Sequence, residues 1–590
     1  MGQELISLRV DELPLLSDII VDLGIKSSLD SILVEHGNWS GISVGQIVEL
    51  WLCYILSECD HRLQNVEEWS ESRIDLLRVL SGNRRLSSLD FTDDKLGLLL
   101  EKVGDSDVWG KIEQKINEKC LSVYRLESAS ELATFRLDAA PMQSHGQVEE
   151  GGLLQYGYHK HHADLPQFKV KLCTLDNELN HFAYPITHLT VSGNMSDDEL
   201  YIPIIKQSKT VLSGISGYEI GNLYVGDSKL GSIGNRSYIV KGLDYYLCPL
   251  SLAQLSQKNR NALIKERDKS TYYEVFREEK GERVKIAEGF EVVESLDYEL
   301  DGEALNWSER RLFVHGTSYA ASQQQAFDKR LAKVIVQIEN LLIRAQGKKY
   351  LSTKEEYQTS INKLLKDNNL EGFLEVKIQC VETTKELRAY GKKAARTEIT
   401  SIFSIEINKN ESAIEEHKSL LGWQVYGTNA LEDLLSYEKC VFKYRHQSNI
   451  EGRFDDLRNK VAHLVPIYLQ KDERIKGLVN ILLLALKVCA VLEYRIAGAL
   501  SKKGEELGNI YEGNPKRTSK KPSAKRILKA FDGISIALIF VNYKLQFAIM
   551  TNLEPIQTQI LELLNIEKEI YTKLADKIQM FFSENFISET

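Results

Sequence analysis

The longest apolar stretch of this 590-residue chain, residues 477–492 (GLVNILLLALKVCAVL), constrains the fold most strongly. Asn480 and Lys487 interrupt it, and it falls short of the ~20 apolar residues that a helix needs to span a bilayer. A second apolar stretch, residues 534–541, is shorter still. We therefore expect no membrane segment, and we expect residues 478–492 to be buried in the core of a folded domain.

A polar segment, residues 444–458 (YRHQSNIEGRFDDLR), precedes this stretch. On a helix of ~100° per residue, four of its side chains lie within about 60° of one another. They are Tyr444, Gln447, Glu451 and Arg458. Such a face offers a carboxylate as a metal ligand, with groups that would contact a phosphate nearby. The alternative is an ordinary solvated helix face.

The overall composition indicates a soluble globular protein of about three or four structural units. Hydrophobic residues make up 43% of the chain and charged residues 27%, and the formal net charge is -10. This charge argues against a surface that is basic throughout, although a local basic groove would still bind nucleic acid. The eight cysteines form no C-x-x-C pair and the N-terminus lacks the features of a signal peptide, so we expect reduced thiols in a cytoplasmic protein.

Residues 1–125 read as a helical domain, with a capped helix starting at Ser43 and an apolar run over residues 47–56. From Ala133 the apolar period changes to two, which predicts a strand that ends at Asp138 because Ala-Ala-Pro follows. Strands over 168–175 and 182–191 would pair as a hairpin, with lysines alternating with apolar residues in the first. A helix capped by Ser196 and a short strand over 223–226, ending at Asp227, come next.

This order predicts a mixed α/β sheet flanked by helices, divided into five parts along the chain. The helical N-terminal domain, expected to bind DNA ends, covers residues 1–125. The first and second parts of the sheet core cover residues 126–250 and 421–500, and an inserted mixed domain covers residues 251–420. Residues 501–590 are expected to form a basic linker and a helical C-terminal domain. The linker includes residues 515–529 (PKRTSKKPSAKRILK), where seven of fifteen residues are Lys or Arg, which indicates either a solvated linker or a phosphate-contacting arm.

Three acids stand out in this arrangement: Asp138, Asp227 and Glu451. Two lie at predicted strand ends, where ligands and metals bind in open α/β sheets, and the third lies on the polar helix. If the helix packs across the sheet, the three carboxylates would hold two Mg²⁺ ions, with Mn²⁺ as a substitute, for phosphodiester chemistry. Because the chain has 84 acidic residues, the triple alone is a weak signal.

The sequence around these acids is more specific. The strings FRLDAAPMQSHG, LYVGDSKLGS, GWQVYGTN and YRHQSNIEGRF resemble bacterial insertion-sequence DDE transposases of the group with a Y-x2-R-x3-E-x6-K signature. The resemblance extends to the N-terminal HGNWSGISVGQIVELWLCYILSECDHRL, to YGYHKHHADLPQFKVKL, and to PSAKRILKAF near the end. It covers nearly the whole chain and implies a ribonuclease-H-like core with an insertion between the second aspartate and the glutamate.

The resemblance also implies roles for individual residues. Asp138, Asp227 and Glu451 would be the catalytic metal ligands, and Tyr444 matches the signature. Gln447 stands where the signature has arginine and Arg458 where it has lysine, so one charge is lost and the other is kept. The expected DNA contacts are Tyr444, Gln447, Arg458, Lys229, Lys516, Arg517, Lys520 and Lys521. For Lys229, a solvated helix residue is the alternative. The three histidines His159, His161 and His162 are read as part of a loop near the DNA or the active site rather than as a metal site.

The function implied is cut-and-paste transposition. The protein would bind the terminal inverted repeats of its element, cleave there by metal-dependent hydrolysis and transesterification through a hairpin, and join the ends to target DNA. A homodimer would hold two ends in the bacterial cytoplasm, associated with the nucleoid. Two alternatives stay open: a domesticated or decayed copy that binds DNA without cutting it, and a ribonuclease-H-like nuclease acting on branched or hybrid substrates.

Overall fold

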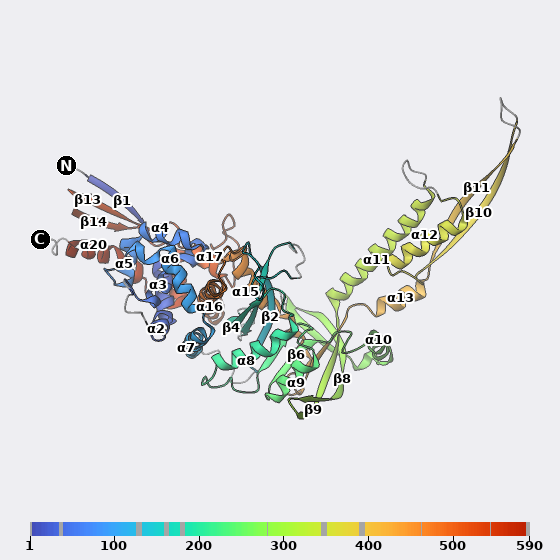
Figure 1. Ribbon diagram of the computed structural model, residues 1–590, viewed down its shortest axis with the longest axis horizontal. Coiled ribbons are helices and arrows are strands. Elements are labelled where there is room, and N and C mark those ends of the chain that lie inside the picture. Colours follow the sequence, from blue (N-terminus) through green and yellow to red (C-terminus); the bar gives the residue numbers. More distant parts are fainter. Residues whose placement is uncertain are drawn as a thin grey trace.

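The computed structural model describes residues 3–34, 39, 41–124, 132–157, 164–176, 183–279, 281–343, 351–388, 396–461, 463–542 and 544–585. Its elements are arranged along one long axis (Figure 1). The N- and C-terminal elements lie together at one end, and a large sheet occupies the middle. An arm of helices and a long hairpin projects from the other end of the molecule.

A nine-stranded mixed sheet forms the centre, with the strand order β4-β3-β2-β5-β6-β12-β9-β8-β7. Strands β4, β3 and β2 are antiparallel, β5 and β6 run parallel to β2, and the other four strands follow in antiparallel pairs. The bounds are β2 Thr134–Gln143, β3 Gln167–Leu175, β4 Tyr184–Ser192, β5 Leu223–Gly226, β6 Tyr245–Pro249, β7 Tyr273–Glu279, β8 Glu282–Leu300, β9 Glu303–Gly316 and β12 Trp423–Thr428. The predicted α/β class and the predicted β3–β4 hairpin are confirmed.

The strand that carries Asp138 is longer than the alanines and the proline after it suggested. β2 continues through Pro141 to Gln143, so Asp138 lies in the middle of the strand and not at its end. β5 pairs with β2 as far as Leu137, and among the described residues no strand pairs with that side of the rest of β2. A proline is tolerated where no neighbouring strand needs its N–H, and this explains the error.

Residues 251–420 do not form one separate inserted domain. Strands β7, β8 and β9 join the central sheet through β12, and α10 (Gln257–Glu266) precedes them. The rest forms the arm, which comprises α11 Thr317–Glu339, α12 Lys354–Asp367, the β10–β11 hairpin and α13 Glu411–Ser419. The hairpin strands are Leu374–Leu387 and Arg396–Lys409. Charged residues fill the outer halves of the long strands, as in ESLDYEL at the end of β8, so a local sequence pattern does not show how far these strands extend.

The two terminal regions share a small sheet that local patterns did not indicate. β1 (Gln3–Arg9) pairs with β13 (Ser535–Val541), which pairs with β14 (Lys544–Met550). Neither region is therefore wholly helical, because β1 from one end of the chain pairs with β13 from the other. The N-terminal helices are α1 Leu13–Asp22, α2 Ile25–Asp30, α3 Val44–Glu58, α4 Val66–Glu71, α5 Ile74–Ser81, α6 Asp93–Val103 and α7 Ser106–Tyr124. The C-terminal helices are α17 Ala524–Lys529, α18 Pro555–Leu564, α19 Glu569–Thr572 and α20 Leu574–Asn585.

The long apolar stretch forms the core of α16 (Asp472–Lys503), and it is buried as predicted. Its two polar interruptions are both bonded, since Asn480 donates to the carbonyl of Val103 and Lys487 donates to Asn117 Oδ1 at 2.7 Å. By length and hydropathy α16 would be able to cross a membrane, but 94% of its most apolar window is buried inside the protein. Burial of this kind is that of a central core helix.

Two further helices position the candidate site. α8 (Tyr201–Val211) packs on β3 and β4, and α9 (Ile233–Lys241) follows β5. The predicted cap of α8 is wrong, because Ser196 bonds the Asp198 side chain and the helix begins at Tyr201 after a short 3₁₀ turn. Pro203 lies in the first turn of α8, where a missing N–H leaves no hydrogen bond unmade. Among the cysteines, Cys380 is exposed, Cys59 is half-buried and the remaining six are buried free thiols.

Candidate active site

The parallel pairing of β2 with β5 brings Asp138 and Asp227 side by side. The last residue pair of that ladder is Leu137 with Gly226, and each aspartate is the next residue of its chain segment. Neighbouring strands lie about 4.8 Å apart, so the two backbones reach the same level of the sheet one strand apart. Asp227 directly follows the last residue of β5, as the short apolar run ending in an acid predicted.

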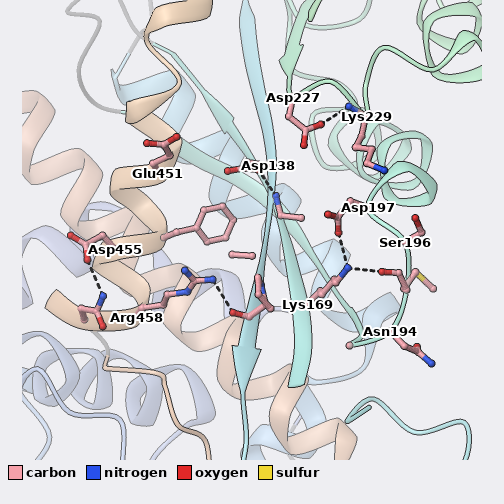
Figure 2. A pocket seen from close by; sticks show the side chains of 17 residues that line it. Asp138, Lys169, Asn194, Ser196, Asp197, Asp227, Lys229, Glu451, Asp455 and Arg458 are labelled. Atoms are coloured by element: carbon pink, nitrogen blue, oxygen red, sulfur yellow. Dashed lines mark hydrogen bonds and ion pairs between the residues drawn. The ribbon is translucent and has the colours of Figure 1, made fainter. Parts of the chain in front are cut away.

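Glu451 reaches the same region from a helix on the other side of β2. α15 (Ser448–Asp455) packs against β2, and the exposed Glu451 side chain faces a pocket of about 930 Å³ that both aspartates also line. Figure 2 shows Asp138 between Glu451 on one wall and Asp227 on the other. The charged lining residues are Asp138, Asp197, Asp227, Glu451, Asp455, Lys169, Lys229 and Arg458. The three predicted acids therefore face one pocket.

Hydrogen bonds restrain one oxygen of each aspartate. Oδ1 of Asp227 accepts from the Tyr201 hydroxyl at 2.7 Å and from the Lys229 backbone N–H at 2.8 Å, and Oδ1 of Asp138 accepts from the Ala139 N–H at 2.8 Å. Within the part of the chain that the structure describes, Oδ2 of both aspartates and the Glu451 carboxylate accept no hydrogen bond. These oxygens are available to a ligand in the pocket.

The electrostatics of the pocket act most strongly on Asp138. Burial raises the pKa of its carboxyl to about 6, and the nearby Asp227 and Glu451 act in the same direction. The Lys171 ammonium and the Ala139 N–H oppose the rise. A cation held between the three carboxylates would offset the repulsion among them.

The donor set fits a hard divalent cation, which prefers carboxylate oxygens. The geometry, however, is not assembled: among the described residues, no three Asp, Glu, His or Cys side chains lie close enough together to hold one metal ion. Glu451 lies across the pocket from Asp227 (Figure 2). The two aspartates lie on neighbouring chain segments and Glu451 lies on the facing wall. The three carboxylates are thus too far apart to hold one metal ion together in this structure.

The segment 444–458 is not one continuous helix. α14 (Tyr437–Arg445) ends before a turn at residues 446–447, α15 then begins, and residues 456–460 form a π-helical turn. The guanidinium of Arg136, on β2, donates to the Lys443 carbonyl at 2.7 Å. This contact satisfies one carbonyl at the end of α14, which a longer helix would have bonded itself.

The break separates the residues of the predicted face. Tyr444 is half-buried against Tyr426, with ring centroids 4.4 Å apart, and does not line the pocket. Gln447 is at the N-cap position of α15, with its buried Oε1 lacking a hydrogen-bond partner among the described residues. Arg458 does line the pocket, where it donates to the Pro141 carbonyl at 2.8 Å. Burial raises the pKa of the Tyr444 hydroxyl to about 12, so this hydroxyl stays protonated.

The remaining predicted DNA contacts lie in two places. Lys229 is an exposed lining residue of the pocket. Lys516, Arg517, Lys520 and Lys521 are all exposed and lie outside the pocket lining. In this basic segment, Arg517 and Arg526 both lie over the Tyr511 ring, at 4.2 and 4.4 Å from its centroid. His159, His161 and His162 lie outside the described residues.

One buried residue near the aspartates was not singled out from the sequence. Lys171 on β3 is 1% exposed, and its ammonium lies 3.4 Å from the centroid of the Tyr201 ring. It is buried because α8 covers the face of β3 to which Lys171 belongs. The alternation of lysines with apolar residues in β3 indicates a strand, but it does not show whether the lysine face is covered by a helix or exposed to solvent.

Comparison with protein-family models and with curated proteins gives no match. Among solved structures, the chain is similar to a piggyBac transposase synaptic complex with hairpin DNA, determined by cryo-EM, at 10% sequence identity and a TM-score of 0.34. The alignment covers 96% of this chain and 84% of that chain. Values this low assign neither a fold nor a function to this chain.

Proposed function

We propose that this protein is a DDE transposase of the insertion-sequence type, which cuts DNA at the ends of its element and joins them to a target. One observation carries the proposal: Asp138, Asp227 and Glu451, in that order along the chain, face a single pocket from β2, the end of β5 and α15. The sheet is mixed, and Asp138 and Asp227 follow the last residue pair of its parallel strands β2 and β5. This arrangement supports the ribonuclease-H-like core that the sequence resemblance implies.

The three carboxylates would hold the catalytic cations, with Mg²⁺ as the proposed metal, two ions per site, and Mn²⁺ as a substitute. When bound, divalent cations lower the pKa of a water molecule and offset the charge on phosphate oxygens. The protein itself supplies the positions of the acids: the β2–β5 register sets Asp138 beside Asp227, and Tyr201 holds Asp227. Ordered strands and a hydrogen-bonded ligand keep the reacting groups in place.

The cations around the pocket would bind the DNA backbone. Lys229 and Arg458 line the pocket beside the acids, and a phosphate there would accept hydrogen bonds from both. The basic segment that contains Lys516, Arg517, Lys520 and Lys521 would add contacts farther along the duplex, and these would weaken as salt increases. Strand transfer needs two ends and a target, so we propose a homodimer in the DNA complex, working in the bacterial cytoplasm at the nucleoid.

A cleavage assay tests the proposal. The full chain would be incubated with Mg²⁺ and a labelled duplex that carries the inverted-repeat sequence flanking its coding region. We expect nicks at the repeat boundary and a hairpin product, both abolished by Asp138→Ala, Asp227→Ala or Glu451→Ala. Glu438→Gln is the matched control, because it changes an exposed carboxylate on α14 outside the pocket.

The same assay separates the two alternatives. A domesticated DNA-binding protein would shift the duplex in a gel without cutting it, and its coding region would lack flanking repeats and target duplications. A branch- or hybrid-specific nuclease would cut forked or RNA–DNA substrates in preference to the repeat end. Cleavage of the repeat duplex that survives the loss of any one of the three acids would overturn the proposed active site.

A further inference from the structure

Lys171 is a buried ammonium for which the described residues supply no hydrogen-bond acceptor. Its side chain is 1% exposed, and no carboxylate oxygen among those residues lies within ion-pair distance of its Nζ atom. A buried charge is normally paired, because its transfer out of water is expensive. A lysine kept in this state points to a role that depends on its charge.

The surroundings of Lys171 show what its charge acts on. Its ammonium lies over the face of the Tyr201 ring, and the hydroxyl of that ring donates to Asp227. Burial lowers the pKa of Lys171 to about 8, and the nearby Asp227 and Asp138 carboxylates oppose this by favouring the charged form. Lys171 is therefore still protonated at pH 7. Since Lys171 does not line the pocket, a DNA phosphate would not displace it from the aspartates.

The charges around the pocket are balanced when no cation is bound. Two lining carboxylates already have partners, since Asp197 pairs with Lys169 at 2.8 Å and Asp455 pairs with Lys460 at 2.5 Å. The three candidate ligands are left, and they face three positive charges: Lys229, Arg458 and Lys171. An incoming divalent cation therefore meets a pocket with little net negative charge.

We propose that Lys171 is the resident counter-cation of the aspartate pair, which keeps the affinity of the pocket for divalent metal low until DNA is bound. This inference rests on the proposed function. A DNA phosphate would engage Lys229 and Arg458 and bring its own negative charge, so metal binding becomes favourable when substrate is present. Lys171 remains with the aspartates throughout, which makes it a positioning residue rather than a catalytic one.

Binding of Mn²⁺ to the full chain tests this role without any need for catalysis. Free Mn²⁺ would be followed by electron paramagnetic resonance at pH 7, with and without the repeat-end duplex, for the wild type and for Lys171→Met, Lys171→Gln and Lys171→Arg. Without DNA, we expect the two neutral variants to bind Mn²⁺ at least about tenfold more tightly than the wild type, because a like charge has been removed. Lys171→Arg keeps the charge and should match the wild type.

Added duplex should tighten Mn²⁺ binding strongly in the wild type and weakly in the neutral variants. If both neutral variants bind Mn²⁺ no more tightly than the wild type, while Asp138→Asn abolishes binding, the role of Lys171 is overturned and the metal site stands. If the wild type and every Lys171 variant fail to bind Mn²⁺ even with duplex, the proposed metal-dependent function itself fails. Thermal unfolding identifies any misfolded variant, and having two neutral replacements keeps the comparison decisive.

Discussion

The hydroxyl of Tyr201 donates a 2.7 Å hydrogen bond to Oδ1 of Asp227, joining the first turn of α8 to the end of β5. The same oxygen accepts from the Lys229 backbone N–H, so Asp227 is restrained from two directions. Among the described residues, Oδ2 of Asp227 accepts no hydrogen bond, and Asp227 lines the pocket. Tyr201 therefore sets the orientation of one proposed metal ligand, although it does not line the pocket itself.

Removing this hydroxyl should weaken the site more than the fold. We expect Tyr201→Phe to reduce end cleavage by about 10- to 100-fold, the usual effect of losing a group that orients a metal ligand. The unfolding free energy should fall by about 1 kcal/mol, measured by urea denaturation. Tyr238→Phe on α9 is the control, and equal losses of cleavage in both variants would show that the Tyr201 hydroxyl has no special role.

Asp138 should destabilise the metal-free protein at neutral pH. Its pKa is raised from 3.8 to about 6, so the folded state binds the proton more tightly than the unfolded chain does. The stability that this protonated carboxyl contributes is present in full below about pH 4 and is lost as pH rises through about 6. Asp138→Asn should therefore be more stable than the wild type at pH 7.5 by about 1 to 3 kcal/mol, with the gap closing near pH 4. A variant less stable than the wild type at pH 7.5 would contradict this account.

Arg453 holds the helix that carries Glu451. Its guanidinium is buried, donating to the Ala183 carbonyl at 2.9 Å, to Asp456 at 2.9 Å and to Glu493 on α16 at 2.7 Å. Arg453→Met leaves two carboxylates without their partner and should cost about 3 to 5 kcal/mol in chemical denaturation.

The control for Arg453 is Arg474→Met. Arg474 pairs with Glu101 at a more exposed position, so its loss should cost less than about 1 kcal/mol. Similar losses in the two variants would mean that burial does not strengthen the Arg453 network.

Gln447 occupies the position at which the signature has arginine. Gln447 is the N-cap residue of α15, and an arginine at this position should add one contact to a DNA phosphate. Gln447→Arg should bind the repeat-end duplex more tightly, and the slope of log affinity against log salt should steepen by about 0.9. Gln358→Arg adds the same charge to α12 of the arm, and an identical change in both variants would rule out a local contact.

The parts of the site that could be predicted from sequence depend on short-range patterns. An apolar run followed by an acid located Asp227, and the length of residues 478–492 indicated the buried helix α16. The features that could not be predicted depend on packing between distant parts of the chain. Lys171 is buried because α8 covers β3, and α14 ends where Arg136 bonds its carbonyl, so neither outcome leaves a mark in the local sequence.

The non-local sheet contacts were equally hidden. β1 has its partner β13 at the opposite end of the chain, and β8 and β9 extend the central sheet through β12. Charged alternation in these strands describes their exposed faces and not their partners. The local pattern therefore predicted strands β3, β4 and β5, but it could not assign residues 273–316 to the central sheet.

The central claim is that Asp138, Asp227 and Glu451 together bind the catalytic metal. It is tested most directly by anomalous diffraction from crystals of the protein grown with Mn²⁺ and the repeat-end duplex. We predict Mn²⁺ peaks within coordination distance of all three carboxylates, which requires Glu451 to move toward the aspartates when DNA binds. Mn²⁺ bound elsewhere on the protein, with these three carboxylates free of metal, would contradict the account.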